Sequence, residues 1–295
     1  MTSWKIWFNA TRPKTLPASL SPVIIGSTIA FYHNSFNFFY FLLISLLAVL
    51  IQISTNFINE LYDFKKGADT TNRLGPTRAV AAGLIDYKSM KFVSIALVIV
   101  IFALGMILVW KSGWIIFVIG VLSLFFAWAY TGGPYPLAYN GWAEPAVLVF
   151  FGIFAVNGTY YVFTNQLDII PLIASLMPGL LSTNLLLINN IRDIETDKLV
   201  NKNTLAVKLG RKNANHLYLV IHFLTLLVPF YLSYYLNNYL LLIPLVLLTM
   251  HIKCVKNAYF LNGRDLNNVL FLNGILILLN GALTSLSFYL LKQYG

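Results

Sequence analysis

The sequence contains few charged residues for its length. Asp, Glu, Lys and Arg make up 10% of the 295 residues, whereas they make up about 25% of a typical soluble domain. Hydrophobic residues account for 58%, and the mean hydropathy is +0.74. This balance does not suit a water-soluble domain, so we expect lipid to be the solvent for most of the chain.

Cysteine is nearly absent, because Cys254 is the single one in the chain. One cysteine excludes an intramolecular disulfide and any metal site built from several cysteines, and we interpret Cys254 as a small residue packed between helices. No glycine-rich motif of the dinucleotide or P-loop type is present, which argues against a nucleotide cofactor. The histidines show no metal-ligand spacing and are assigned no chemistry; they are His33, His216, His222 and His251.

Long apolar runs, by contrast, recur along the whole sequence. A helix needs about 20 residues to cross the hydrocarbon core of a bilayer. No run shows the two-residue alternation of a barrel strand, and a helix satisfies its own backbone hydrogen bonds in lipid. The sequence therefore predicts an all-α fold with a single domain over residues 1–295. We expect nine transmembrane helices, at residues 16–33, 38–58, 90–110, 114–130, 143–163, 168–189, 217–236, 239–255 and 268–291.

Basic residues are distributed unevenly between the two sides that nine spans imply. Of the 20 Lys and Arg residues, all but Lys111 and Lys292 lie in the N-terminal segment or in, or within three residues of, the loops after the second, sixth and eighth spans. Positively charged loops stay in the cytoplasm, so we predict a cytoplasmic N-terminus in a multi-pass protein of the cell (inner) membrane. The net charge of +10 then reflects topology and attraction to the anionic lipid bilayer. We predict no nucleic acid and no obligate protein partner.

Acidic residues are rarer than basic ones, and six of the ten lie in two short segments. Each segment begins at the cytoplasmic end of an apolar span, the second and the sixth. If these helices continue, spacings of three and four residues place most of the acids on one face with Asn56, Asn59 and Asn189, whereas Glu195 points elsewhere. In a bundle, two such faces can meet across one cavity. The six acids are Glu60, Asp63, Asp69, Asp193, Glu195 and Asp197.

The composition of the two acidic segments suits a metal ion and a phosphate group. Like charges this close destabilise one another unless a cation lies among them. Neither segment contains His or Cys, and oxygen ligands alone suit Mg²⁺, which usually binds through one or two carboxylates plus substrate phosphates. We therefore predict a diphosphate site that opens to the cytoplasm; the alternative is two solvated helix ends whose charges pair with one another. The basic residues interleaved with the acids are Lys65, Lys66, Arg73, Arg78, Arg192, Lys198 and Lys202.

Four segments carry a resemblance to a known family. They read RPKTLPASLSPVIIGS at 12–27, RLGPTRAVAAGLI at 73–85, YTGGPYPLAYNGWAE at 130–144 and NNIRDIETDKLVNKNTLAVKLG at 189–210. Together with the first acidic segment, they resemble the UbiA superfamily of intramembrane prenyltransferases. Within that superfamily, the Gly-Pro-x-Arg stretch favours the 1,4-dihydroxy-2-naphthoate prenyltransferases.

The first acidic motif departs from the usual superfamily pattern in two places. That pattern commonly reads Asn-Asp-x-x-Asp-x-x-x-Asp, whereas here Glu60 replaces the first Asp and five residues separate Asp63 from Asp69. The naphthoate enzymes share the longer gap, so it supports that subgroup.

The resemblance implies a reaction and a set of site residues. The reaction is Mg²⁺-dependent transfer of a polyprenyl group from polyprenyl diphosphate to 1,4-dihydroxy-2-naphthoate, with loss of carbon dioxide. The metal ligands it implies are Glu60, Asp63, Asp69, Asp193 and Asp197. Among the catalytic residues we also count Arg78 and Lys202, either of which could bind the acceptor carboxylate or the diphosphate. To substrate binding we assign Asn56, Asn59, Lys65, Lys66, Arg73, Asn189, Arg192, Lys198, Tyr130, Tyr139 and Arg12.

Two alternative functions remain open from the sequence. One is a superfamily member with another acceptor, such as 4-hydroxybenzoate, homogentisate, haem or a glycerol phosphate. The other is an ion-coupled transporter, because nine helices with a loose internal repeat and grouped acids could bind a coupling ion. Transporters place such groups at broken helices near the membrane midplane, whereas these acids lie at helix ends, which favours the enzyme.

Overall fold

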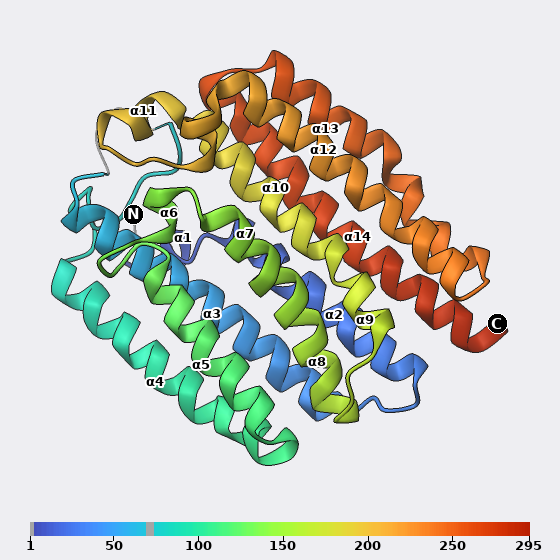
Figure 1. The fold of residues 1–295 in the computed structure, drawn as a ribbon. Coiled ribbons are helices and arrows are strands. Elements are labelled where there is room, and N and C mark those ends of the chain that lie inside the picture. Colours follow the sequence, from blue (N-terminus) through green and yellow to red (C-terminus); the bar gives the residue numbers. More distant parts are fainter. Residues whose placement is uncertain (1–2, 69–73) are drawn as a thin grey trace.

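The structure, a computed structural model, describes residues 3–68 and 74–295. These residues form helices and no strands, so the all-α prediction is confirmed. Figure 1 shows the long helices lying side by side in one bundle. The first half contains α1 (Ser3–Ala10), η1 (Pro13–Thr15), α2 (Leu16–Tyr32), α3 (Phe38–Lys65), α4 (Tyr87–Ser112), α5 (Trp114–Ala129), α6 (Leu137–Asn140) and α7 (Ala143–Leu148). The remainder contains η2 (Val149–Phe154), α8 (Ala155–Thr164), α9 (Ile169–Ala174), α10 (Leu176–Arg192), α11 (Ile194–Leu199), α12 (Leu205–Tyr235), η3 (Tyr239–Leu247), α13 (Leu248–Phe260), η4 (Gly263–Asp265) and α14 (Leu266–Tyr294).

Eight helical segments within the described ranges are long and apolar enough to cross a membrane. A ninth apolar helix, α5, has 16 residues, which gives a length of about 24 Å. All nine coincide with the apolar runs of the sequence, but that α5 also crosses the bilayer stays a prediction. The eight segments are Trp4–Tyr32, Phe38–Lys65, Tyr87–Ser112, Ala143–Thr164, Ile169–Arg192, Leu205–Tyr235, Tyr239–Phe260 and Gly263–Tyr294.

Two helices extend further than the apolar runs predict. Helix α3 continues past residue 58 to Lys65, because the polar residues of its last turns are buried against neighbouring segments and find hydrogen-bond partners there. Helix α12 begins at Leu205, well before residue 217, and bends at Gly210, where φ is 72°. In both helices the additional turns lie where the acidic segments begin or end.

Side chains and glycines at the helix ends explain where several helices start. Asn37 Oδ1 accepts a hydrogen bond from Tyr40 N at the start of α3, and Asp86 and Asp168 cap α4 and α9 in the same way. Such caps satisfy the free N–H groups of a first turn. Gly113, with φ at 78°, connects α4 directly to α5. The two helices therefore form an antiparallel hairpin.

Helix α2 packs against both α8 and α14 near the centre of the bundle. Small residues permit this close approach: a Cβ placed on Gly26 of α2 would be 2.6 Å from the carbonyl oxygen of Val156, and one on Gly281 of α14 would meet Ser21 of α2. Lipid gives little hydrophobic drive between helices, so small residues and tight packing are the usual source of association. A second apolar core joins α10, α12, α13 and α14.

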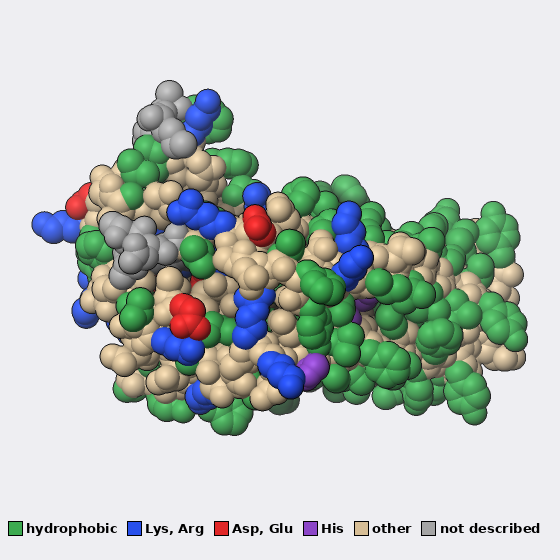
Figure 2. All heavy atoms as spheres, turned by 90° about the horizontal axis from the view of Figure 1, so that it is seen from above, with side chains coloured by type: hydrophobic (Ala, Val, Ile, Leu, Met, Phe, Trp, Pro, Cys, Tyr) green, Lys and Arg blue, Asp and Glu red, His purple; other side chains and the backbone are tan. Residues whose placement is uncertain are grey.

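The two ends of the bundle differ in composition. In Figure 1, α1, α6, α11 and residues 74–86, which lead into α4, lie at one end. Figure 2 shows the Lys, Arg, Asp and Glu side chains gathered at one end of the visible surface, while the other end is hydrophobic. Lys111 and Lys292 belong to the last turns of α4 and α14, at the opposite end. The structure thus separates the basic residues by end, and the membrane side of each end stays a prediction.

Candidate active site

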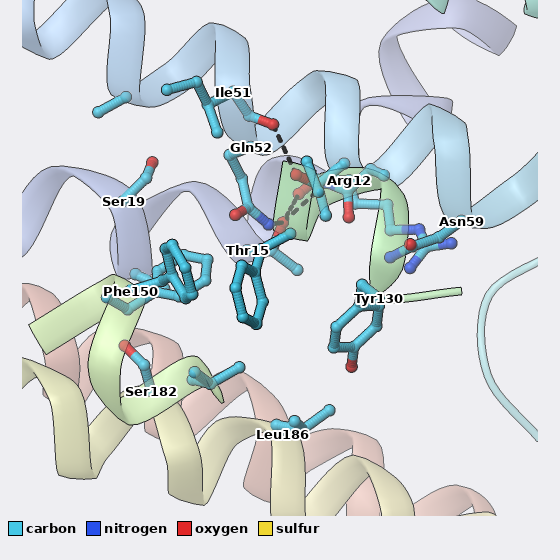
Figure 3. Close-up of a pocket in the computed structure, with 18 of the residues that line it drawn as sticks. Arg12, Thr15, Ser19, Ile51, Gln52, Asn59, Tyr130, Phe150, Ser182 and Leu186 are labelled. Atoms are coloured by element: carbon cyan, nitrogen blue, oxygen red, sulfur yellow. Dashed lines mark hydrogen bonds between the residues drawn. The ribbon is translucent and has the colours of Figure 1, made fainter. Parts of the chain in front are cut away.

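A cavity of about 1050 Å³ begins at the polar end and extends into the apolar interior. Its walls come from α2, α3, α4, α5, α8 and α10 and from the segment after residue 74. Figure 3 shows Arg12, Gln52, Asn59, Tyr130 and Ser182 around the same space. Side chains that are far apart in the sequence therefore line the same cavity.

The first acidic segment forms the buried polar face at the end of α3. Asp63 accepts hydrogen bonds on both oxygens: Arg78 Nη2 donates to Oδ2 at 2.9 Å, and Tyr139 Oη donates to Oδ1 at 2.8 Å. Glu60 Oε1 accepts from the backbone N–H of Val80 at 2.8 Å. These contacts fix the segment around residue 78 against α3, and they bring the cation of Arg78 onto the Asp63 carboxylate.

Amides on the same face of α3 connect it to other segments. Asn59 Oδ1 accepts a hydrogen bond from Thr131 Oγ1 at 2.9 Å. Asn56 Nδ2 donates to the backbone oxygen of Thr11 at 2.9 Å and to Thr15 Oγ1 at 3.1 Å. Both amides line the cavity, as the sequence predicts. Their hydrogen bonds hold the N-terminal segment and the chain after α5 against α3.

The second acidic segment is built around Arg192 at the end of α10. Its guanidinium donates to both oxygens of Asp193, from Nε at 2.8 Å and from Nη2 at 2.5 Å. It also donates to the side-chain oxygens of Asn189 and Asn267 at 2.9 and 2.7 Å. One arginine thus orients three polar side chains. Helix α10 ends at this arginine. The short helix α11 that follows carries Asp197, which also lines the cavity.

The surroundings of Asp197 show that the two acidic segments lie close together. Lys202 Nζ lies 3.3 Å from its Oδ1, and its Oδ2 is buried and accepts no hydrogen bond from any residue that the structure describes. Burial raises the pKa of Asp197 from 3.8 to about 6; Lys202 opposes this shift, while the negative charges of Asp193 and Asp63 add to it. Asp63 belongs to the first acidic segment, so the two segments act on one another across the cavity.

Basic and aromatic side chains also lie near the acids. Lys66 Nζ donates to the backbone oxygen of Thr131 at 2.7 Å and lies 4.0 Å from the centre of the Tyr139 ring, with Lys202 Nζ 5.7 Å from the same ring. Although Lys66 is exposed as a whole, partial burial of its ammonium group lowers its pKa. Such contacts stabilise cations at an aromatic face. Arg12 and Tyr130 line the cavity beside Asn59 (Figure 3).

Some residues assigned from the sequence lie away from the cavity. Lys65 and Lys66 are exposed at the end of α3, and Lys198 is exposed and pairs with Glu195 at 3.1 Å. None of these three lysines lines the cavity. Tyr139 does not line it either, but contacts it through Asp63. Asp69 and Arg73 lie outside the described residues, so their assignment stays a prediction.

The cavity lining also includes Gln52 and Asn190, two polar residues that were not predicted from the sequence. Gln52 Nε2 donates to Thr15 Oγ1 at 3.1 Å, and Asn190 Nδ2 donates to Glu144 Oε1 at 2.9 Å. The buried Glu144 Oε2 has no hydrogen-bond partner among residues 3–68 and 74–295. These residues could have been found from the sequence as polar residues inside apolar runs. Burying such a group without a hydrogen-bond partner is costly, so its presence in an apolar run indicates a partner or a site.

The acids do not form a complete metal site alone. Among the described residues, no three Asp, Glu, His or Cys side chains are grouped so that they could hold a metal ion. The donor chemistry nevertheless fits a hard cation held jointly with phosphate: the Asp63, Asp193 and Asp197 carboxylates line one cavity, and Asp197 Oδ2 is free to bind. Mg²⁺ needs only one or two carboxylates when phosphate oxygens and water complete its shell.

Comparisons with known proteins identify the family of the chain. Residues 19–279 match the UbiA prenyltransferase family. The 1,4-dihydroxy-2-naphthoate octaprenyltransferase of Haemophilus influenzae is 35% identical over 261 residues, covering 84% of each chain. The protein of the same name from Escherichia coli is 37% identical over 216 residues, covering 70% of each.

A solved structure has the same fold. A UbiA homolog from Archaeoglobus fulgidus, bound to GPP and Mg2+, matches with a TM-score of 0.68 at 14% identity, over 95% of this chain and 99% of that one. The transporter alternative is not supported, since the related proteins named above are prenyltransferases. The chain is therefore an integral membrane protein that belongs to the UbiA prenyltransferase family.

Proposed function

We propose that the protein transfers a polyprenyl group from polyprenyl diphosphate to 1,4-dihydroxy-2-naphthoate, releasing carbon dioxide and diphosphate and forming a demethylmenaquinol, the reduced form of a demethylmenaquinone. The observation that carries the proposal is the meeting of Asp63, Asp193 and Asp197 at the polar end of a cavity whose remainder is mostly apolar. A diphosphate with a long hydrocarbon chain needs both environments. The names of the Haemophilus and Escherichia relatives support this acceptor.

The acidic end is the proposed diphosphate site. Asp63, Asp193 and Asp197 would hold Mg²⁺ together with phosphate oxygens, and Glu60 and Asp69 remain further predicted ligands. The bound ion would neutralise the charge that develops on the leaving diphosphate. The Archaeoglobus homolog, which was solved with GPP and Mg2+, supports this choice of cation. We place the ion among these residues because their donors are hard oxygens.

Each of these three carboxylates is paired with a cation: Arg78, Arg192 or Lys202. A guanidinium presents several N–H groups in a planar fork and binds carboxylate and phosphate by the same geometry. We propose that these cations donate to phosphate oxygens when substrate is bound, while remaining close to their carboxylates. Asn59 and Asn189, which line the same end, would add neutral hydrogen bonds.

The apolar walls protect the allylic carbon once its bond to oxygen weakens. Water must be excluded from a developing carbocation, and aromatic faces stabilise positive charge. Tyr130 lines the cavity near Arg12 and Asn59 (Figure 3), which makes it the proposed aromatic wall. Arg78 and Lys202 are the two candidates to bind the carboxylate of the acceptor. We propose that the cavity opens to the cytoplasmic side of the inner membrane, as the basic residues at that end predict.

The test is a reconstituted assay. Purified protein in lipid nanodiscs is given a polyprenyl diphosphate and dihydroxynaphthoate, with Mg²⁺ or with a chelator. With Mg²⁺ we expect a demethylmenaquinol, detected as the quinone after oxidation in air, and one carbon dioxide per product; with the chelator we expect neither. Parallel reactions with 4-hydroxybenzoate and homogentisate test the acceptor. Preferential prenylation of one of those two acceptors would show that the proposed acceptor is wrong. Product formation in the presence of chelator would show that the reaction does not depend on Mg²⁺.

A further inference from the structure

Two polar side chains line the cavity well away from the acids. Gln52 on α3 and Ser182 on α10 both contribute to the lining, and Figure 3 shows them on opposite sides of the same space. Gln52 lies 11 residues before Asp63, and Ser182 lies 11 residues before Asp193. Eleven residues make about three helical turns and about 16 Å. Each polar side chain therefore lies on the same helix face as its acid, but deeper in the bundle.

Hydrogen bonds fix the orientation of the Gln52 amide. Thr15 Oγ1 donates its single proton to the backbone oxygen of Arg12 at 2.9 Å, so from other side chains it can only accept. It accepts from Gln52 Nε2 and from Asn56 Nδ2, each at 3.1 Å. The Gln52 nitrogen therefore faces Thr15. The Gln52 oxygen Oε1 is buried and accepts no hydrogen bond from any residue in the described part of the chain.

The hydroxyl of Ser182 is also buried, and it has no hydrogen-bond partner within residues 3–68 and 74–295. Ser and Thr in a helix often donate to the carbonyl four residues earlier, as Thr183 does to Gly179 at 2.9 Å. Gln52 is 8% exposed and Ser182 is 3% exposed. Burying polar groups without a partner is costly. One acceptor oxygen and one hydroxyl are thus left for a ligand in the cavity.

The chemistry of this pair suits a neutral hydroxyl group. A prenyl chain has no polar atom, and an ionised diphosphate presents acceptor oxygens, which cannot bind the carbonyl oxygen of Gln52. The aromatic acceptor, by contrast, has hydroxyl groups. In 1,4-dihydroxy-2-naphthoate the 1-hydroxyl is adjacent to the carboxylate and can donate to it. The 4-hydroxyl has no partner within the molecule, so burying it requires one from the protein.

We propose that Gln52 and Ser182 bind the 4-hydroxyl of the acceptor, with Gln52 Oε1 accepting its hydrogen bond and Ser182 Oγ donating to its oxygen. The inference rests on the proposed function, in which Arg78 or Lys202 binds the acceptor carboxylate at the polar end. The 4-hydroxyl is farther from the carboxylate than the 1-hydroxyl is, so it lies deeper. Holding the ring at both places orients the carbon that bears the carboxylate toward the prenyl donor.

The test measures acceptor binding without turnover. Purified protein in lipid nanodiscs, with Mg²⁺ and inorganic diphosphate in place of the donor, is titrated under argon with 1,4-dihydroxy-2-naphthoate or 1-hydroxy-2-naphthoate, which lacks the 4-hydroxyl. Naphthoate fluorescence gives each Kd. We expect the wild type to bind the dihydroxy compound about tenfold more tightly. Ser182→Ala and Gln52→Met should each weaken its binding about three- to tenfold and leave the Kd of the monohydroxy compound within about twofold.

Ser54→Ala is the matched control. Ser54 lies on α3 and also has a buried hydroxyl with no partner among the described residues, but it does not line the cavity. Removing its hydroxyl should leave the Kd of both naphthoates at the wild-type value. A loss of binding in Ser54→Ala equal to that in Ser182→Ala would overturn the inference.

The possible results separate this inference from the proposed function. No binding of either naphthoate by the wild type would contradict the proposed acceptor. Equal Kd values of the wild type for the two naphthoates would overturn the role of Gln52 and Ser182 alone, as would equal weakening of both compounds by Ser182→Ala. If Gln52→Met lowers the Tm because Thr15 loses a partner, Ser182→Ala decides, because it removes only one oxygen atom.

Discussion

Arg78 Nη2 lies 2.9 Å from Asp63 Oδ2, and both side chains are buried at the polar end of the cavity. Arg78 comes from the Gly-Pro-x-Arg stretch, and Asp63 comes from the end of α3. The ion pair therefore joins the two sequence features that carry the family resemblance. It also supplies, within one contact, a carboxylate for a metal ion and a cation for phosphate.

Replacing Asp63 with Asn should nearly abolish turnover. Asn keeps the shape and one acceptor oxygen for Arg78, and its amide N–H can donate to the Tyr139 hydroxyl, but it removes the negative charge proposed to bind Mg²⁺, so we expect a loss of at least about 100-fold in kcat. Burying Arg78 beside a neutral partner should also cost about 2 kcal/mol of stability. Activity with octaprenyl or geranyl diphosphate and the Tm in detergent measure the two effects.

The control for this variant is Glu195→Gln. Glu195 lies in the second acidic segment, but its side chain is 83% exposed and paired with exposed Lys198. Such pairs contribute little, so both activity and Tm should remain at the wild-type value. Activity of Asp63→Asn equal to that of Glu195→Gln would contradict the metal role of Asp63.

Chelation should stop the reaction without unfolding the protein. Asp63, Asp193 and Asp197 each have a cationic partner in the chain, at 2.9, 2.5 and 3.3 Å. Like-charge repulsion among the acids is thus compensated when no metal is bound. We expect turnover to disappear in chelator and to return on adding Mg²⁺, while helix content by circular dichroism stays constant. A large loss of helix on chelation would show instead that the metal is structural.

Much of this architecture could be predicted from the sequence because membrane helices leave a strong local signal. The nine apolar runs coincide with the helices, and spacings of three and four residues correctly placed Asn56, Asn59, Glu60 and Asp63 on one buried face. That signal is local: it depends on neighbours along one helix. Whether the second acidic segment faces the first depends on how the helices pack, which the sequence of either segment does not determine.

Contacts between distant helices left no comparable signal. Glu144 and Asn190 meet at 2.9 Å, and His222 Nδ1 lies 3.0 Å from His251 Nδ1, although the histidines are 29 residues apart. The sequence also did not show which way the Lys198 side chain points. It is exposed to solvent, although Lys198 is the residue after Asp197. Spacing along one helix does not determine which other helix lies alongside it.

The pKa of Asp197 predicts how the metal-free protein responds to pH. The value rises from 3.8 to about 6 on folding, so the folded state binds the proton more tightly. This favours folding fully below pH 3.8, and the contribution is lost as the pH rises through about 6. At about pH 7.5, keeping this carboxylate charged costs about 3 kcal/mol.

In chelator, Asp197→Asn should therefore have a higher Tm than the wild type at about pH 7.5, and the difference should shrink toward about pH 4. Asp265→Asn is the control, because Asp265 is exposed in the short helix η4. It should follow the wild type at every pH. An Asp197→Asn variant less stable than the wild type at neutral pH would mean that the Lys202 ion pair outweighs the cost of burial.

The contact between η2 and α10 gives a test of packing that is independent of catalysis. A Cβ on Gly152 would be 2.7 Å from the carbonyl oxygen of Ser175 and 2.8 Å from Gly179 Cα, both of them backbone atoms. Since backbone cannot rotate away, Gly152→Ala must push the two helices apart, and overpacking of this kind costs about 1 to 3 kcal/mol.

Gly158→Ala is the matched control for Gly152→Ala, because it also adds one methyl group to a buried helical glycine. The nearest atom to its Cβ would be Ile119 Cδ1 at 3.6 Å, an ordinary contact with a flexible side chain. Replacing a helical glycine by alanine also favours the helix by up to about 1 kcal/mol, so its Tm should equal or exceed the wild-type value. Equal Tm values for the two variants would contradict the close approach of η2 to α10, because both replace a buried helical glycine by alanine and only the Cβ at residue 152 would meet backbone atoms at under 3 Å.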